Sequence, residues 1–310
     1  MVTAATSRLD DRTRRRARRG LSIYFAIVVV LSAAIEAFII SNPELDGLIA
    51  GLMLVPALAS VVARLVLREG FADVSFRIGG RRGWSAIGLS LIFPVVIGLI
   101  AYGTAWTSGL AGFDPPTASR GLVAAFVPFA VGMIVSLIVV SGEEIGWRGY
   151  MLTRLIDAGV PRPVLVSGLI WGLWHVPLVL AGVYAAGPSP ALSATLIMVS
   201  ITSFGYVIAR VRLETGSVWP AIVLHTAWNS IIQGPFDGAT TGAGATLWVG
   251  ESGILTALTL AVAAVIFSRG RWTIVRSLPR HKKTPDVQDV AAFQTTLNAE
   301  KAGREGASHP

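Results

Sequence analysis

Two adjacent carboxylates interrupt an apolar stretch of the chain and are the first candidates for chemistry. Glu143 and Glu144 follow an apolar run that ends at Val140, and Arg148 comes four residues after the second acid. On a helix, an acid four residues before an arginine has the favourable orientation for an ion pair. Glu144 is therefore expected to pair with Arg148. Glu143, about 100° further around the helix, is left without a partner, and such a carboxylate in an apolar cleft suits a general base.

Two histidines and an asparagine complete the set of candidate polar groups. His175 lies in WGLWHVPL, just before Pro177, and His225 lies in VLHTAWNS with Asn229 four residues later. Residues four apart project from one face of a helix. A carboxylate, two imidazoles, an amide and an arginine can activate water and stabilise an oxyanion, or hold a metal. For each histidine and for the amide taken alone, hydrogen bonding between packed helices is the competing explanation.

The composition indicates a multi-pass protein of the cell membrane. The chain has 310 residues, of which 53% are apolar and only 14% charged, whereas about a quarter of the residues of a soluble domain are charged. The net charge of +8 is divided among the segments between apolar stretches, which argues against nucleic acid and for the lipid bilayer as partner. There is no cysteine, so thiolate nucleophiles and thiolate metal ligands are excluded.

Apolar segments long enough to cross a bilayer, about 20 residues each, predict an all-α bundle of about eight transmembrane helices. The expected spans are residues 21–40, 48–67, 85–107, 121–141, 163–183, 191–211, 217–234 and 252–268. Arginines gather before the first span, in alternate loops and after the last span, so both termini are expected to be cytoplasmic. The Glu143–Glu144 pair then stands at the cytoplasmic end of the fourth span, and a cleft around it should open near the cytoplasm.

The same pattern divides the chain into five segments. Residues 1–20 form a basic cytoplasmic tail, expected to be disordered against anionic lipid, and residues 21–120 form the N-terminal transmembrane helices. All the candidate site residues lie in 121–235. The last helix and its preceding loop occupy 236–268, and 269–310 is a polar cytoplasmic tail. Glu36, an acid in the first span with no companion, is interpreted as structural or interfacial.

The order of the motifs resembles a known family. The residues that carry the resemblance are, in chain order, Glu143, Glu144, Arg148, His175, His225 and Asn229. This order resembles the type II CAAX prenyl endopeptidase and bacteriocin-processing family of intramembrane proteases, also called the CPBP or Abi family. The resemblance covers about 121–235. One departure is Trp171, four residues before the first histidine, where the family commonly has Phe; it bears on the shape of the pocket and not on the chemistry.

The resemblance implies an enzyme, an intramembrane metalloendopeptidase similar to CAAX proteases, with an all-helical fold. By this resemblance, Glu143 would be the base that activates water, and His175 would help to hold that water or a metal. His225 and Asn229 would stabilise the oxyanion or complete the polar site, and the adjacent Glu–Arg ion pair would hold the base in place.

A divalent metal, with zinc as the first choice, is implied by the usual description of the family as metalloproteases. Its ligands would be Glu143, His175 and His225, since two imidazoles and one carboxylate make a three-ligand catalytic zinc site with an open position for water. The chain has no His-Glu-x-x-His motif, the spacing that brings two zinc imidazoles and a base together. Because a carboxylate that binds metal is less available as a base, a metal-free glutamate mechanism stays open.

Three functional hypotheses follow. The leading one is an intramembrane endopeptidase that hydrolyses a peptide bond of a membrane-associated peptide or protein substrate with a glutamate-activated water, with or without the assistance of a metal. The second is a non-catalytic membrane immunity or scaffold protein, in which the same polar cluster serves packing or partner binding. The third is a proton-coupled transporter, because buried Glu and His also mark proton relays; the chain shows no long internal repeat, which argues against it.

Overall fold

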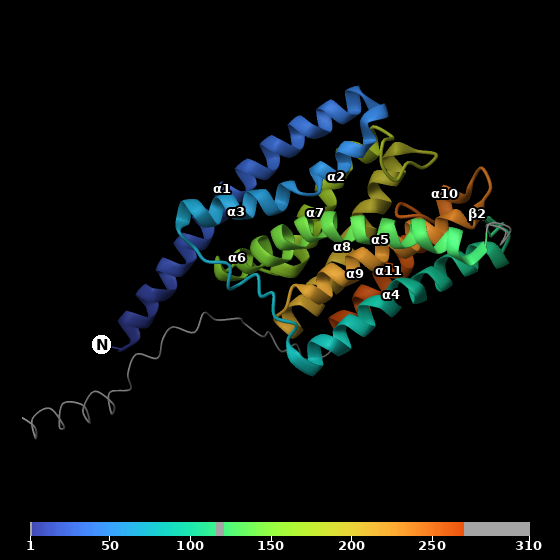
Figure 1. Ribbon diagram of the computed structural model, residues 1–310. Coiled ribbons are helices and arrows are strands. Elements are labelled where there is room, and N and C mark those ends of the chain that lie inside the picture. The colour runs from blue at the N-terminus through green and yellow to red at the C-terminus, as the bar shows by residue number, and fades with distance from the viewer. Residues whose placement is uncertain (1, 116–120, 270–310) are drawn as a thin grey trace, which may run out of the picture. The chain divides into compact units, whose positions relative to one another are not determined.

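Helices make up almost all of the structure, a computed structural model that describes residues 2–115 and 121–269 (Figure 1). The helical elements of the first half are α1 (Val2–Ser41), η1 (Pro43–Leu48), α2 (Ile49–Leu52), α3 (Val55–Leu67), α4 (Gly80–Thr107) and α5 (Gly121–Gly146). Those of the second half are the π-helical turn η3 (Trp147–Met151), α6 (Leu152–Asp157), α7 (Pro163–Leu180), α8 (Pro190–Thr215), α9 (Trp219–Ile231), the π-helical turn η4 (Ile232–Phe236), α10 (Ala245–Trp248) and α11 (Ile254–Ser268). The predicted all-α membrane bundle is confirmed.

A helix occurs at each of the eight expected spans, but the helices differ in length. In the described part of the chain, six segments are long and apolar enough to cross a bilayer: Asp11–Ser41, Ile49–Leu67, Gly80–Thr107, Val127–Asp157, Pro163–Leu180 and Pro190–Thr215. The seventh and eighth spans correspond to α9 and α11, with 13 and 15 residues. A multi-pass membrane protein is therefore supported, while the count of eight and the side of the termini stay predictions.

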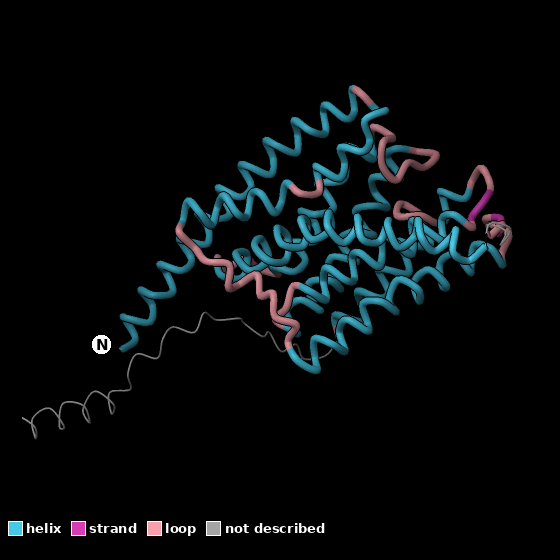
Figure 2. The backbone as a smooth tube through the Cα atoms, in the orientation of Figure 1, coloured by secondary structure: helices cyan, strands magenta, loops and turns pink. Residues whose placement is uncertain are grey.

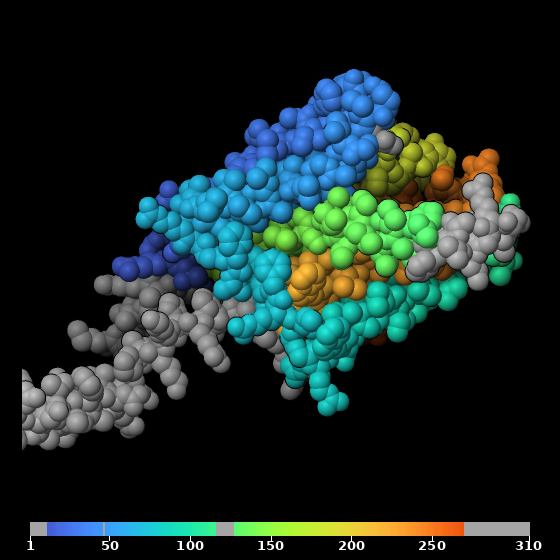
Figure 3. Space-filling model, viewed as in Figure 1, coloured from blue at the N-terminus to red at the C-terminus, as the bar shows by residue number. Residues whose placement is uncertain are grey.

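The outward faces of the long helices carry large apolar side chains, as expected for surfaces that meet lipid. Leu99 on α4 is 60% exposed and Ile138 on α5 is 61% exposed. Figure 3 shows α9 between α4 and α5 on one face of the molecule, and α9 packs against both of them. The candidate residues of α9 are thus enclosed by longer helices.

The basic N-terminal segment is helical, which corrects the expectation of a disordered tail in residues 1–20. Helix α1 begins at Val2 and continues without a break into the first span. Its segment 11–20 is rich in arginine, which is a strong helix former. Arg16 donates to Glu69 at 3.2 Å, and Ala17 is buried. The expected tail at 269–310 lies, apart from its first residue, outside the described residues.

The helical rod that carries the two acids is longer than the expected span 121–141. Helix α5 runs on through Gly146, and η3 and α6 extend it, so that the apolar helical segment is Val127–Asp157. Glu143 lies next to the midpoint of this segment, not at its end. The charged residues after position 141 suggested a loop; Arg148 and Arg154 instead form ion pairs inside the bundle. The expected end of the fourth span at residue 141 is therefore wrong, while the side of the membrane on which a cleft opens stays a prediction.

Two glycines on α5 allow α3 to come close to the acids. Gly142 and Gly146 bracket the Glu143–Glu144 pair at a spacing of four residues. A Cβ at Gly142 would lie 2.9 Å from the Met53 carbonyl oxygen, and a Cβ at Gly146 would fall on the backbone of Pro56. Small residues at such a spacing let membrane helices pack backbone to backbone. The side of α5 next to the acids is thereby sealed.

A two-stranded pairing holds the segments at the far end of α4. Strand β1 (Gly112–Phe113) pairs antiparallel with β2 (Thr240–Thr241), with Gly112 opposite Thr241 (Figure 2). Two side chains of α4 add to this connection: the Tyr102 hydroxyl donates to Asp237 at 2.5 Å, and the Trp106 indole donates to Thr240 at 3.1 Å. The segment after α9 is therefore fastened to α4 rather than loose.

Replacing Gly146 by alanine should destabilise the protein by about 1–3 kcal/mol, because the new methyl group cannot be placed without moving α3. Thermal unfolding of the detergent-solubilised protein, followed by tryptophan fluorescence, measures the effect. The matched control is Gly132→Ala on the same helix, where a Cβ meets nothing within 4 Å and alanine improves helix propensity by up to about 1 kcal/mol. Equal stability of the two variants would contradict the close packing of α3 on α5.

Candidate active site

The expected ion pair between Glu144 and Arg148 is present and completely buried. A guanidinium nitrogen of Arg148 donates to Oε1 of Glu144 at 2.9 Å, and both side chains are 0% exposed. The same carboxylate oxygen lies 2.9 Å from Nδ1 of His225 on α9. The guanidinium also stacks on the ring of Trp171, 3.9 Å from its centre, as cations do on aromatic faces. This pair therefore connects α5 and η3 with α7 and α9.

Glu143 has different partners from its neighbour. Its Oε2 atom accepts a hydrogen bond from the indole N–H of Trp171 at 2.7 Å and a longer one from Trp147 at 3.3 Å. Both donors are neutral, and the side chain of Glu143 is buried. The two acids thus differ as expected: Glu144 forms an ion pair with a guanidinium, and Glu143 accepts hydrogen bonds from two indoles. Trp171, which was expected only to shape the pocket, is the link between Glu143 and the pocket described below.

The two histidines are oriented by bonds to the rest of the site. His175 lies near the C-terminal end of α7, and its Nδ1 is 2.8 Å from the carbonyl oxygen of Trp171, so this nitrogen carries the proton and donates it. His225 uses its own Nδ1 toward Glu144. In both rings Nε2 is the nitrogen left for other groups. Second bonds of this kind fix the tautomer and the direction of an imidazole.

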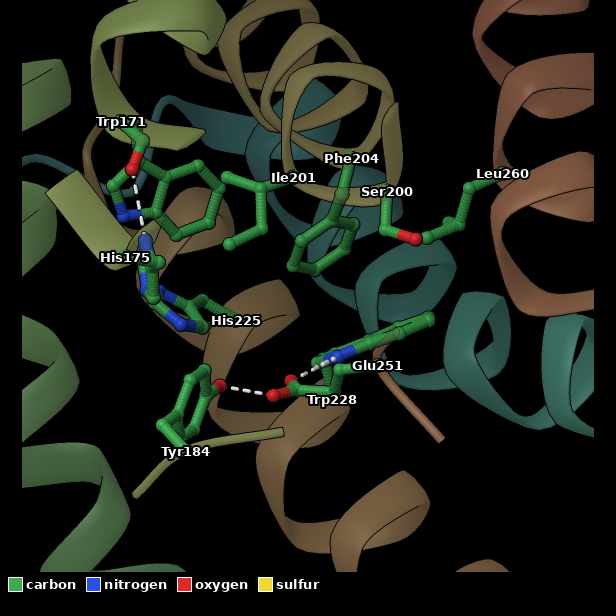
Figure 4. A pocket seen from close by; sticks show the side chains of 10 residues that line it. All are labelled: Trp171, His175, Tyr184, Ser200, Ile201, Phe204, His225, Trp228, Glu251 and Leu260. Carbon is green, nitrogen blue, oxygen red and sulfur yellow. Dashed lines mark hydrogen bonds between the residues drawn. The ribbon is translucent and has the colours of Figure 1, made fainter. Parts of the chain in front are cut away.

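A small pocket, here called the histidine pocket, contains both imidazoles (Figure 4). It is lined by Trp171, His175, Tyr184, Ser200, Ile201, Phe204, His225, Trp228, Glu251 and Leu260. Its free space is about 20 Å³. One water molecule needs roughly 10–15 Å³ measured in this way, so the pocket has room for a single water and for little more.

Two predicted residues lie beside this pocket and not in its wall. Glu143 is behind Trp171, whose ring lines the pocket and whose N–H holds the carboxylate. Asn229 is half-buried one turn after His225 on α9, and it is not among the lining side chains. The structure thus brings His175, His225, Glu144 and Arg148 into one connected cluster, with Glu143 attached to it through an indole.

Several lining residues were not predicted from the sequence, and Glu251 is the acid among them. Glu251, just before α11, accepts hydrogen bonds from the Tyr184 hydroxyl and from the Trp228 indole, the second at 2.9 Å. Figure 4 shows it across the pocket from the histidines. In the sequence it is a single acid in a loop, 108 positions after Glu143, and no helical spacing relates it to the other motifs. Only its position next to an apolar helix could have pointed to it.

The predicted metal ligands do not converge in this arrangement. In the described part of the chain, no three His, Asp or Glu side chains lie close enough to hold one metal ion. The Oε2 atom of Glu143 is occupied by indole donors, and Nδ1 of each histidine is bound to protein. Two imidazole Nε2 atoms remain, which is one ligand short of a catalytic zinc site. Zinc held by Glu143, His175 and His225 therefore stays a prediction.

Glu144→Gln should destabilise the protein by about 3–5 kcal/mol, because it leaves the buried Arg148 charge uncompensated. The double variant Glu144→Gln/Arg148→Met should recover part of this loss, since no charge is then left unpaired. Thermal unfolding in detergent measures both. Glu214→Gln is the control, because it breaks the more exposed Arg210–Glu214 pair of α8, where the cost should stay below about 1 kcal/mol. A double variant less stable than the single variant would contradict this account.

A comparison with known families identifies the part of the chain that holds the site. Residues 124–231 match the family described as Type II CAAX prenyl endopeptidase Rce1-like. The match begins in α5 and ends at the last residue of α9, so it includes both acids, the arginine, both histidines and Asn229. No curated protein matches the chain. This Rce1-like segment supports the resemblance to the CPBP family of CAAX-protease-type intramembrane endopeptidases that the order of the motifs predicted.

Proposed function

We propose that the protein is an endopeptidase of the cell membrane that hydrolyses a peptide bond of a membrane-associated peptide or protein, with Glu143 as the base. The observation that carries the proposal is the division of the two acids. Glu144 is neutralised by Arg148, whereas Glu143 is held in place by neutral indole donors. A carboxylate without a cationic partner in a dry site is the better proton acceptor of the two.

The histidine pocket supports the second half of the proposal. It has room for one water molecule, and both imidazoles face it with fixed orientations. Trp171 connects the two parts, because its ring lines the pocket and its N–H binds the carboxylate of Glu143. Polar groups held rigidly in a low-dielectric site stabilise developing charge without first having to reorganise.

The reaction follows from these roles. In this structure the Trp171 indole stands between Glu143 and the histidine pocket, so it has to move aside before Glu143 can reach the water. Glu143 then accepts a proton from the water, and the resulting hydroxide attacks the carbonyl carbon of the peptide bond. The Nε2 atom of His175, which carries no proton when Nδ1 does, accepts a hydrogen bond from the attacking water. The negative charge that develops on the carbonyl oxygen is stabilised by His225 in its doubly protonated form, next to Glu144, with Asn229 one turn away. When the tetrahedral intermediate collapses, Glu143 returns its proton to the leaving amine nitrogen. Glu144 and Arg148 take no part in bond making; they hold His225 and Trp171 in position.

Glu143→Gln should reduce the cleavage rate by about 10²–10⁴-fold, the usual contribution of a general base, while the protein stays folded. The amide oxygen of glutamine still accepts the Trp171 hydrogen bond, so the structural change is small. The assay compares new peptide N-termini in membranes of a deletion strain complemented with either form. A scaffold or immunity protein would behave differently, because its phenotype would survive this substitution.

The matched control is Glu36→Gln, which removes another buried carboxylate of the membrane helices. Glu36 lies on α1, outside the cluster of candidate residues, and its loss should leave cleavage within about twofold of the unmodified protein. Equal loss of activity in the two variants would show that buried carboxylates matter only for folding. Retained cleavage in Glu143→Gln would remove Glu143 as the base.

Treatment with a zinc chelator tests the metal assistance that the family resemblance predicts. Because no three described ligands converge, we expect cleavage by the purified protein to survive the chelator. The assay is run with and without added zinc, magnesium and manganese, beside metal analysis of the same sample. Activity that disappears with the chelator and returns only with zinc would overturn this expectation and favour Glu143, His175 and His225 as metal ligands.

A further inference from the structure

A second and larger hollow lies beside the histidine pocket and is here called the outer hollow. Its space is about 340 Å³, and its wall comes from residues 184–186, 233, 237, 240–242, 245–246 and 249–252. Tyr184 and Glu251 line both spaces. The hydrogen bond from the Tyr184 hydroxyl to Glu251 is therefore part of the wall that separates the histidines from the outer hollow.

The sizes of the two spaces show that this wall has to move for a peptide to be cleaved. The histidine pocket, at about 20 Å³, holds one water molecule and cannot also hold a peptide group. The outer hollow, at about 340 Å³, can take several atoms of a polypeptide chain. A substrate that enters the outer hollow meets the imidazoles only after Tyr184 and Glu251 separate.

The wall is built from loop segments that are joined by a few hydrogen bonds. The Trp228 indole donates to Glu251 at 2.9 Å, and the Ser252 hydroxyl donates to the Ala185 carbonyl at 2.7 Å. The backbone N–H of Gly250, a residue with φ of +86°, donates to the Tyr102 hydroxyl at 3.0 Å. Loops held in this way open more readily than packed helices do.

The charges at the two ends of the bundle differ. Among the residues that line the outer hollow, the charged side chains are Asp237 and Glu251. In a cavity near the start of α4, the charged lining residues are Arg81, Arg82 and one acid, Glu214. Figure 1 shows β2 and α10 near the end of α4, away from its start. By the positive-inside rule, the outer hollow faces the non-cytoplasmic side.

We propose that the substrate polypeptide binds in the outer hollow before cleavage and reaches it from the non-cytoplasmic side. The Tyr184–Glu251 hydrogen bond is then a gate, closed in this structure, between the outer hollow and the histidine pocket. The proposal rests on the proposed function and names its substrate class: a polypeptide segment with lysine or arginine next to the cleaved bond. The two carboxylates attract such a segment, because clefts lined by one sign of charge concentrate ligands of the opposite sign.

Single cysteines test the side and the charge preference directly, because the chain has no cysteine of its own. Thr246→Cys places one thiol in the outer hollow. In intact cells, membrane-impermeant methanethiosulfonates should modify it. Each reagent's rate at this position is divided by its rate with a free thiol. The normalised rate should be about tenfold higher for the positively charged trimethylammonium reagent than for the negatively charged sulfonate reagent, and Glu251→Gln should reduce this ratio. A short oligolysine peptide should slow the modification, and oligoglutamate should not.

Ser85→Cys is the matched control at the other end of α4. Its thiol lies beside Arg81 and Arg82, so it should react only after the membrane is opened and should prefer the sulfonate reagent. Modification of Thr246→Cys only in opened membranes would overturn the proposed side of access. Equal rates for the two reagents at this position would overturn the substrate class.

The role of the Tyr184–Glu251 hydrogen bond as a gate is tested with a thiol inside the histidine pocket. Ser200→Cys lines that pocket and is 3% exposed in the closed structure. Adding Tyr184→Phe removes the hydroxyl that binds Glu251, and modification of Ser200→Cys from outside should become at least tenfold faster. The rate at Thr246→Cys should stay unchanged. If Tyr184→Phe left the rate at Ser200→Cys unaltered, the Tyr184–Glu251 hydrogen bond would not be the gate. All rates are measured in Glu143→Gln protein as well, where they should be the same, so the outcome is independent of whether cleavage occurs.

Discussion

A pair of opposite charges with no access to water organises this protein. Glu144 and Arg148 are both completely buried in a bundle of apolar helices, where an unpaired charge would be expensive. Each also contacts another helix: the carboxylate lies against His225 of α9, and the guanidinium lies on Trp171 of α7. Neutralising one charge therefore positions two further groups of the site.

The same arrangement explains why two adjacent acids can do different things. Glu143 and Glu144 share a helix and a membrane depth, yet one meets a guanidinium and the other meets two indole N–H groups. Trp171 takes part in both environments, since its ring stacks on Arg148 and its nitrogen binds Glu143. Replacing that indole would therefore remove a contact of the ion pair, a hydrogen bond of the proposed base and part of the wall of the histidine pocket.

The features that could be predicted from the sequence depend on short, regular spacing. The spacing of four between Glu144 and Arg148 predicted their pairing, and long apolar runs predicted the helices. The extent of the helical rod beyond residue 141 could not be predicted in this way, because buried arginines read as loop residues until their partners are known. The same holds for Arg16, whose contact with Glu69 joins segments far apart in the chain. Glu251 and Tyr184 lie in loops, where neither periodicity nor composition indicates which pocket they face.

The partners of the ion pair lie in the same helical rod, and this has a consequence for biosynthesis. Because Glu144 and Arg148 are four residues apart, they can neutralise each other as soon as that rod becomes helical. The translocon therefore does not have to wait for α7 or α9 before it releases the segment into lipid. Trp147, four residues after Glu143, offers the other acid a donor from the same rod. The helix that carries both acids is thus equipped to enter the bilayer alone, and the helices with the histidines can assemble around it afterwards.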